Sequence, residues 1–185
     1  YAERLEKAAS SINDLAEEYE TCSFTCYIPD RGIGSFVNPA IALMSNAADT
    51  SFIEEHFAGQ LNESVSCIVE SHESVDEYFD SYYSTDHHWT IDGAYKGYVA
   101  LSRELGIAAL EPSNRVSYPQ YPFYGSSART GLFLGLTDCI SDYEFDLPEM
   151  RVWRNGEEIV RNGKLDYVSG EVDEKKVWSN GYGYY

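Results

Sequence analysis

The chain has 185 residues, 43% of them hydrophobic, and a formal net charge of −18 from 31 acidic and 13 basic residues. This length and composition predict one folded domain with a real core. The acidic surface argues against nucleic acid and anionic lipid as partners. The sequence has no run of about 18 apolar residues, so no membrane span is predicted.

The N-terminal part of the chain is predicted to alternate helices and strands. Residues 2–19 repeat apolar side chains at helical spacing, and residues 51–61 do so again. Residues 21–30 and 64–71 are compact apolar runs of β-formers, which predict buried strands. This alternation predicts an α/β fold with a mainly parallel sheet flanked by helices.

Two further helices are predicted on either side of a histidine-rich loop. Residues 74–83 form the first, with Ser74 as N-cap and Glu77 three residues later, a capping-box pattern. Thr90 is expected to cap the second helix and Gly106 to end it. The buried stripe expected for this second helix consists of Ala94, Tyr95, Tyr98, Val99, Leu101 and Leu105.

The C-terminal part has a different pattern. Residues 112–131 are rich in Pro, Ser and Tyr and predict a loop with short strand pieces. Residues 150–163 predict a β-hairpin, because Asn155-Gly156 favours a type I′ turn between apolar pairs. The predicted organisation is an α/β core carrying the histidine-rich loop, 1–110, and a loop-rich and β-hairpin extension of the same domain, 111–185.

The stretch "TDHHW", Thr85 to Trp89, contains the strongest candidate for chemistry. Asp86 and His88 stand two residues apart, so their side chains leave an extended loop on the same side. A carboxylate there can fix the tautomer of the imidazole and leave its other nitrogen as a base. A solvated turn remains the alternative, because short D-x-H strings are common.

A metal site is the second interpretation of the same residues, with Asp86, His87 and His88 as ligands. Neighbouring histidines are expected to point apart, and no further Cys/His cluster has ligand spacing. We therefore expect neither a metal nor a cofactor.

The four cysteines are too few and too scattered to predict a disulfide framework. Cys22 and Cys26 would lie about 13 Å apart in an extended strand, too far for a mutual disulfide. We expect all four cysteines to act as small buried hydrophobic residues: Cys22, Cys26, Cys67 and Cys139. Whether any of them is oxidised stays open.

The block "YYSTDHHWTIDGAYKGY" resembles the signature of the DHHW protein family of Gram-positive bacteria. That family is similar to the SGNH-hydrolase-like domains of the alginate O-acetyltransferases, which carry a D-x-H-W string. The strand ending in "YIPDR" and the later "FYGSSARTG", Phe123 to Gly131, are similar to the layout of that family. The resemblance covers most of the chain.

The resemblance implies an SGNH-hydrolase-like, flavodoxin-like α/β fold and an extracytoplasmic location. It also implies carbohydrate O-acetyltransferase or esterase chemistry on an acyl ester of a cell-envelope or exported polysaccharide. By the same resemblance, Asp86 and His88 would be the catalytic acid and base. The residues expected on the substrate side are Trp89, His87 and Tyr124.

The nucleophilic serine of such a site is not recognisable in the sequence. In the relatives it lies after the D-x-H-W block in a G-D-S-like motif, and no such motif follows Trp89. "YGSS", Tyr124 to Ser127, also lacks the G-x-S-x-G pattern and is interpreted as a polar turn. We therefore expect an incomplete, inactive domain, or alternatively a non-catalytic glycan-binding or surface-interaction module that uses the tyrosine-rich segment 117–124.

Overall fold

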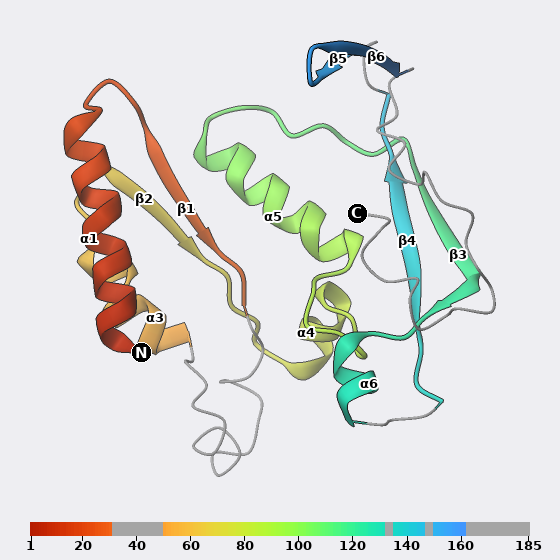
Figure 1. The fold of residues 1–185 in the computed structure, drawn as a ribbon. Helices are drawn as coiled ribbons and strands as arrows, with labels where there is room; N and C mark the ends of the chain where they lie inside the picture. Colours follow the sequence, from red (N-terminus) through yellow and green to blue (C-terminus); the bar gives the residue numbers. More distant parts are fainter. Residues whose placement is uncertain (31–49, 132–134, 147–149, 162–185) are drawn as a thin grey trace. The chain divides into compact units, whose positions relative to one another are not determined.

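The chain forms two compact units with mixed α and β structure (Figure 1). The computed structural model describes residues 1–30, 50–131, 135–146 and 150–161. The N-terminal unit contains residues 1–81 and 92–109, and the C-terminal unit contains residues 82–91 and 110–185. The sequence-based boundary near residue 110 assigns the histidine-rich loop to the N-terminal part, whereas the structure groups this loop with the C-terminal part.

The N-terminal unit contains a parallel pair of strands, as the alternating pattern predicts. Strand β1 (Phe24–Ile28) pairs with β2 (Val65–Val69), and Cys26 stands opposite Cys67 in the register. Both strands are mostly half-buried rather than fully buried. The other elements before β2 are α1, α3 and a short 3-10 helix, η1, with bounds Ala2–Glu18, Thr50–His56 and Ala58–Gln60.

The predicted cap of helix α4 (Val75–Ser81) is present. The backbone amide of Glu77 donates to Ser74 Oγ at 3.1 Å. The Glu77 carboxylate accepts from the amide of Glu73 at 2.8 Å, one residue before the cap. The capping box is therefore present, but the Glu77 side chain accepts from the residue before the N-cap and not from the N-cap itself.

Helix α5 (Ile91–Glu104) ends at Gly106, as predicted, but its buried face is not the predicted one. Gly106 has φ 67°, and the amide of Ile107 donates to the carbonyl of Ser102 at 2.9 Å, which is a Schellman ending. The fully buried positions are Gly93, Gly97 and Ser102. Of the predicted stripe, Ala94, Tyr95 and Leu101 are half-buried, whereas Tyr98, Val99 and Leu105 are exposed. A Cβ on Gly93 would overlap the carbonyl of Ser81, so close backbone packing decides which face is buried.

Acidic, histidine and tyrosine side chains lie close together at and just beyond the carboxyl ends of β1 and β2. Buried His72 places Nδ1 at 2.9 Å from Asp30 and Nε2 at 3.7 Å from Glu70. Burial and the neighbouring Asp30 and Glu70 carboxylates raise the pKa of Tyr78 to about 12. Burial and Glu70 likewise raise the pKa of Tyr27 to about 12. Both phenols therefore stay neutral at ordinary pH.

The C-terminal unit contains two antiparallel pairs of strands. Strand β3 (Asn114–Phe123) pairs with β4 (Asp138–Glu144), and helix α6 (Ser126–Gly131) follows β3. The sequence-based expectation of a loop with short strand pieces over 112–131 is therefore only partly right, because one ten-residue strand and a short helix occupy most of this range. A break in the register between Ser117 and Pro122 lets the proline-containing strand keep its pairing.

The predicted C-terminal hairpin is confirmed. Strands β5 (Met150–Arg154) and β6 (Glu157–Arg161) pair antiparallel around Asn155 and Gly156, which have φ 54° and 82°. Positive φ at both turn residues is the geometry of a type I′ turn. Of the three strand pairs in the described ranges, only β1–β2 is parallel, so the expected mainly parallel sheet is represented there by one pair.

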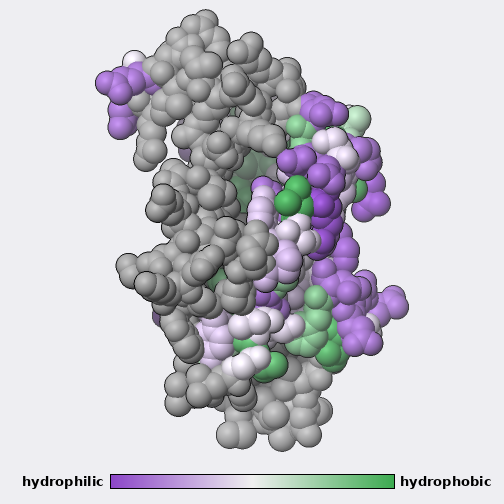
Figure 2. Space-filling model, turned by 90° about the vertical axis from the view of Figure 1, so that its right-hand side faces the viewer, coloured by the Kyte–Doolittle hydropathy of each residue, from purple (hydrophilic) through white to green (hydrophobic). Residues whose placement is uncertain are grey.

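The face drawn in Figure 2 carries hydrophilic and intermediate colours over most of its described part, with smaller separate hydrophobic areas. This agrees with the excess of acidic residues. Within the described parts of the chain, no helix combines the length and the apolar character needed to cross a membrane.

Candidate functional site

The histidine-rich loop is closed at its ends and anchored in the middle, all within the C-terminal unit. Tyr82 and Trp89 form an antiparallel bridge, and the amide of Tyr83 donates to the carbonyl of His88 at 3.1 Å. The amide of Thr85 donates to the Asp138 carboxylate of β4 at 2.8 Å, and the Thr85 hydroxyl donates to the same oxygen. These contacts fix the loop backbone just before Asp86.

The turn between β3 and α6 lies directly against this loop. Gly125 donates its amide to Thr85 Oγ1 at 3.0 Å, and the amide of Ala128 donates to the Thr85 carbonyl at 3.1 Å. A Cβ on Gly125 would overlap both the Thr85 carbonyl and the Asp86 side chain. The absent side chain of Gly125 therefore allows the start of α6 to reach Asp86.

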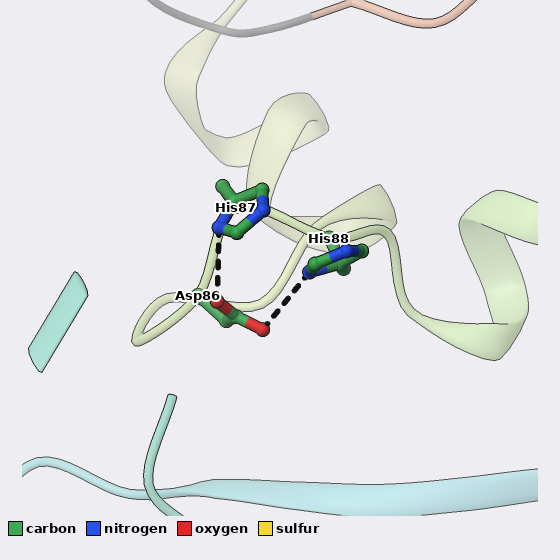
Figure 3. Close-up of side chains that lie close together, drawn as sticks. All are labelled: Asp86, His87 and His88. Carbon is green, nitrogen blue, oxygen red and sulfur yellow. Dashed lines mark hydrogen bonds and ion pairs between the residues drawn. The ribbon is translucent and has the colours of Figure 1, made fainter. Parts of the chain in front are cut away.

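The Asp86 carboxylate is the centre of the site (Figure 3). Its side chain is 0% exposed, and Oδ2 lies 3.1 Å from Nδ1 of His88. Oδ1 accepts the backbone amide of Ser126 at 3.2 Å and also its hydroxyl. The contact expected between Asp86 and His88 is therefore present. The His88 side chain is 46% exposed, so its ring is partly open to solvent.

His87 joins the same carboxylate from the other side. Its Nδ1 lies 3.2 Å from Asp86 Oδ1 and 3.0 Å from Ser126 Oγ. The centroids of the His87 and His88 rings are 4.0 Å apart, and Figure 3 shows both rings turned toward Asp86. The expectation that the neighbouring histidines point apart is therefore wrong, because the loop curves around the carboxylate instead of running extended.

The structure brings a serine to this site. From the sequence, this serine was interpreted as part of a polar turn. Ser126 stands at the first residue of α6, and its hydroxyl donates to Asp86 across 40 positions of sequence. Ser127 follows it and is exposed. The missed signal was a glycine and two serines directly between a strand and a helix, a position where a nucleophile can stand on a tight turn.

The chain has the fold of known proteins. A structure of Bacillus cereus PatB1 matches with a TM-score of 0.61 and 18% identity over 100% of this chain and 66% of that chain. A structure of B. cereus PatB1 with a sulfonyl adduct matches with a TM-score of 0.59 and 16% identity, over 82% of this chain and 53% of that one. A DHHW family protein from Eubacterium siraeum matches with a TM-score of 0.55 and 18% identity, over 77% and 47% respectively.

These similarities concern the fold alone, because the identities are low. The chain spans about half to two thirds of the length of the matched chains. No protein-family model matches the sequence, and no curated protein matches it.

The two aromatic residues expected on the substrate side differ in their surroundings. Trp89 is half-buried at the closing bridge of the loop. Tyr124 is only 4% exposed, and its hydroxyl donates to the carbonyl of Ala128 at 3.2 Å. Burial of Tyr124 favours a structural role over the expected contact with substrate.

The four cysteines are free thiols, and, contrary to the expectation, not all of them are buried. Cys22 and Cys139 are exposed, whereas Cys26 and Cys67 are half-buried at opposed positions of β1 and β2. Burial and the neighbouring Cys26 raise the pKa of the Cys67 thiol to about 11. Burial also raises the pKa of Cys26.

Proposed function

We propose that the chain carries an SGNH-hydrolase-like site for acyl transfer or ester hydrolysis. One observation carries this proposal: a buried carboxylate, Asp86, contacts both His88 and the amide and hydroxyl of Ser126. Carboxylate and imidazole are two of the three groups of a nucleophilic relay, and the contacts of Ser126 hold the adjacent Ser127, the candidate for the third, beside the same loop. Such a relay needs no cofactor.

Asp86 orients the base in the proposed relay. When His88 donates its Nδ1–H to Oδ2 at 3.1 Å, the lone pair is left on Nε2. The His88 side chain is 46% exposed, which suits a base that has to meet a reacting hydroxyl. Loss of the Asp86 charge would leave the imidazole free to adopt the unproductive tautomer.

We assign the nucleophile to Ser127 and a positioning role to Ser126. The Ser126 hydroxyl donates directly to Asp86, so its proton faces a carboxylate, which is a much weaker base than imidazole. Ser127 is exposed at the start of α6, one residue further along. Ser126 then holds the first turn of α6 in register with the loop that carries His88.

The proposed reaction runs through an acyl-enzyme. Ser127 Oγ attacks the carbonyl carbon of an acyl ester while His88 Nε2 takes the hydroxyl proton. The bond to the leaving oxygen breaks, and His88 returns the proton to that oxygen. A sugar hydroxyl then attacks the acyl carbon for transfer, or water for hydrolysis, and its proton passes through His88 back to Ser127.

The substrate class is a carbohydrate acyl ester of the cell envelope or of an exported polysaccharide, at an extracytoplasmic location. This part of the proposal rests on the resemblance of the "TDHHW" block and on the similarity in fold to PatB1 and the DHHW family protein. No contact among the described residues favours the alternative, a glycan-binding module built on segment 117–124, and Tyr124 of that segment is buried.

A sulfonyl fluoride tests the nucleophile directly. Sulfonyl groups bond covalently to activated hydroxyls, and a sulfonyl adduct is known for PatB1. Residues 1–185 are treated with phenylmethylsulfonyl fluoride, and turnover of p-nitrophenyl acetate is followed in parallel. We expect one adduct, on the Ser127 peptide in mass spectrometry, and its loss in Ser127→Ala and His88→Ala.

The alanine variants of the two serines show which of them is the nucleophile. An adduct that persists in Ser127→Ala and disappears in Ser126→Ala would move the nucleophile to Ser126. Absence of both adduct and turnover in the folded chain would contradict the proposed function.

A further inference from the structure

Three side chains of the histidine-rich loop form a cluster with the geometry of a metal site. One ligand atom each from Asp86, His87 and His88 lies within 4.8 Å of the others. We propose that this cluster binds a divalent late transition metal, Zn²⁺ being the best fit, and that bound metal switches off the relay. The binding stands by itself, and the inhibition rests on the proposed function.

The distances suit a tetrahedral ion. Two ligands at about 2.0–2.2 Å from Zn²⁺ at a tetrahedral angle are about 3.3 Å apart. The two Asp86 oxygens lie 3.2 Å and 3.1 Å from the Nδ1 atoms of His87 and His88. Each Nδ1 atom thus lies at ligand–ligand spacing from one oxygen of the same carboxylate, and one ligand atom from each of the three residues lies within 4.8 Å of the others.

The three ligands leave room for a fourth. The His87 and His88 side chains are 65% and 46% exposed, whereas the Asp86 side chain is buried, so an ion would reach the cluster from the histidine side and could keep water in the open position. Two imidazoles and one carboxylate suit zinc better than Mg²⁺ or Ca²⁺, which prefer oxygen ligands. The net charge of −18 further raises the local concentration of cations.

The carboxylate is held in place for this role. Ser126 donates both its amide and its hydroxyl to Asp86 Oδ1, and such outer hydrogen bonds orient ligating carboxylates in metal sites. The buried cluster around His72 lacks this convergence. Its two nitrogens face different carboxylates, Asp30 and Glu70, from opposite edges of one ring.

Metal and relay exclude one another because they use the same atom. In the relay, His88 Nδ1 carries a proton and donates it to Asp86. A metal ion bound at Nδ1 replaces that proton, which passes to solvent, and also takes up the Asp86 oxygen. The imidazole is then fixed by the ion and no longer by the carboxylate, so its orientation as a base is lost.

Calorimetry of the untagged 185-residue chain with zinc chloride tests the binding. We expect one ion per chain, released by EDTA. His87→Ala and His88→Ala should each weaken binding by about tenfold or more, because even outer-shell changes cost metal sites about 10–100-fold. His56→Ala is the matched control, since His56 also faces a carboxylate, Glu6 at 2.9 Å, but has no second histidine beside it.

A second measurement does not depend on how the variants fold. Co²⁺ added to the unmodified chain should give the intense visible bands of a tetrahedral nitrogen and oxygen site, and Zn²⁺ should displace them. Binding that is unchanged in both histidine variants, or no zinc binding and no tetrahedral cobalt spectrum, would overturn the proposal.

Activity separates this proposal from the proposed function. We expect zinc to abolish ester turnover and EDTA to restore it. Zinc binding at the cluster by a chain without turnover would contradict the proposed function and leave the metal site standing. Turnover that persists at saturating zinc would overturn the inhibitory part of the inference.

Discussion

Gly125 donates its amide to the Thr85 hydroxyl at 3.0 Å, and the Thr85 carbonyl fills the space where a Cβ on Gly125 would stand. Two backbone segments of the C-terminal unit thus meet without an intervening side chain, an approach that only glycine allows. The hydrogen bonds from Ser126 to Asp86 depend on this approach, since Ser126 follows Gly125 directly.

Gly125→Ala should therefore disrupt the site as well as the fold. Overpacking of this kind costs about 1–3 kcal/mol of unfolding free energy, measurable by urea denaturation. Sulfonyl labelling should be lost as well, because the start of α6 moves away from Asp86. Gly106→Ala is the control: at φ 67° with no atom within 4 Å, it strains only the end of α5, so its labelling should stay intact. Unchanged stability and labelling in Gly125→Ala would contradict this account.

Two aspartates of the site should respond differently to the same substitution. Asp86→Asn keeps the shape but removes the charge that orients His88, and on the proposed function we expect turnover to fall by about 10⁴-fold, the loss that the same change causes in a serine-protease triad. Asp138→Asn, which weakens the anchoring of Ser84 and Thr85, should mainly lower stability. Kinetics with an acetyl ester and urea denaturation of each variant separate the two effects. Equal losses of turnover would argue against an orienting role for Asp86.

The phenols near β1 and β2 predict a loss of stability at alkaline pH. Tyr78 has its pKa raised to about 12, whereas a tyrosine of the unfolded chain ionises near 10. The stabilisation is therefore complete below about pH 10 and is lost as the pH rises through about 12. Urea denaturation between these pH values should show a smaller decline for Tyr78→Phe. Tyr98→Phe, at an exposed position, should follow the unmodified chain.

The cysteines should react in two classes. Cys22 and Cys139 are exposed, whereas the raised pKa values of Cys26 and Cys67 leave little thiolate at neutral pH. Titration with a thiol reagent at neutral pH should modify two residues quickly and two slowly, and peptide mapping assigns them. Early modification of Cys67 would show that the β1–β2 pair opens readily.

Local patterns predicted the elements but not their contacts. The Ser74 cap, the Gly106 ending of α5 and the Asn155-Gly156 turn are encoded within a few residues, and each is present. The buried face of α5 was mispredicted because glycine packing outweighed apolar side chains at that surface. Strand β3 was predicted only as short strand pieces because its prolines argue against a regular ladder, and the break in register lets one long strand accommodate them.

The contacts of Asp86 were predicted only in part for the same reason. Asp86 and His88 are two residues apart, so their contact follows from local geometry. Ser126 lies 40 positions further along, and nothing in its neighbourhood identifies its partner. The inward turn of His87 was also missed, because it follows from the curvature that the anchors at Asp138 and Gly125 impose on the loop.

Because of these anchors, the conformation of residues 85–89 depends on the whole C-terminal unit. Thr85 is tied to a residue 53 positions away and Asp86 to one 40 positions away, so the loop has its shape only after both long closures have formed. In hydrogen exchange, the amides of Thr85, Gly125 and Ser126 should open together as one cooperative group. A peptide of residues 82–98 would have the sequence of the motif but not its conformation, because the residues that anchor the loop lie outside it.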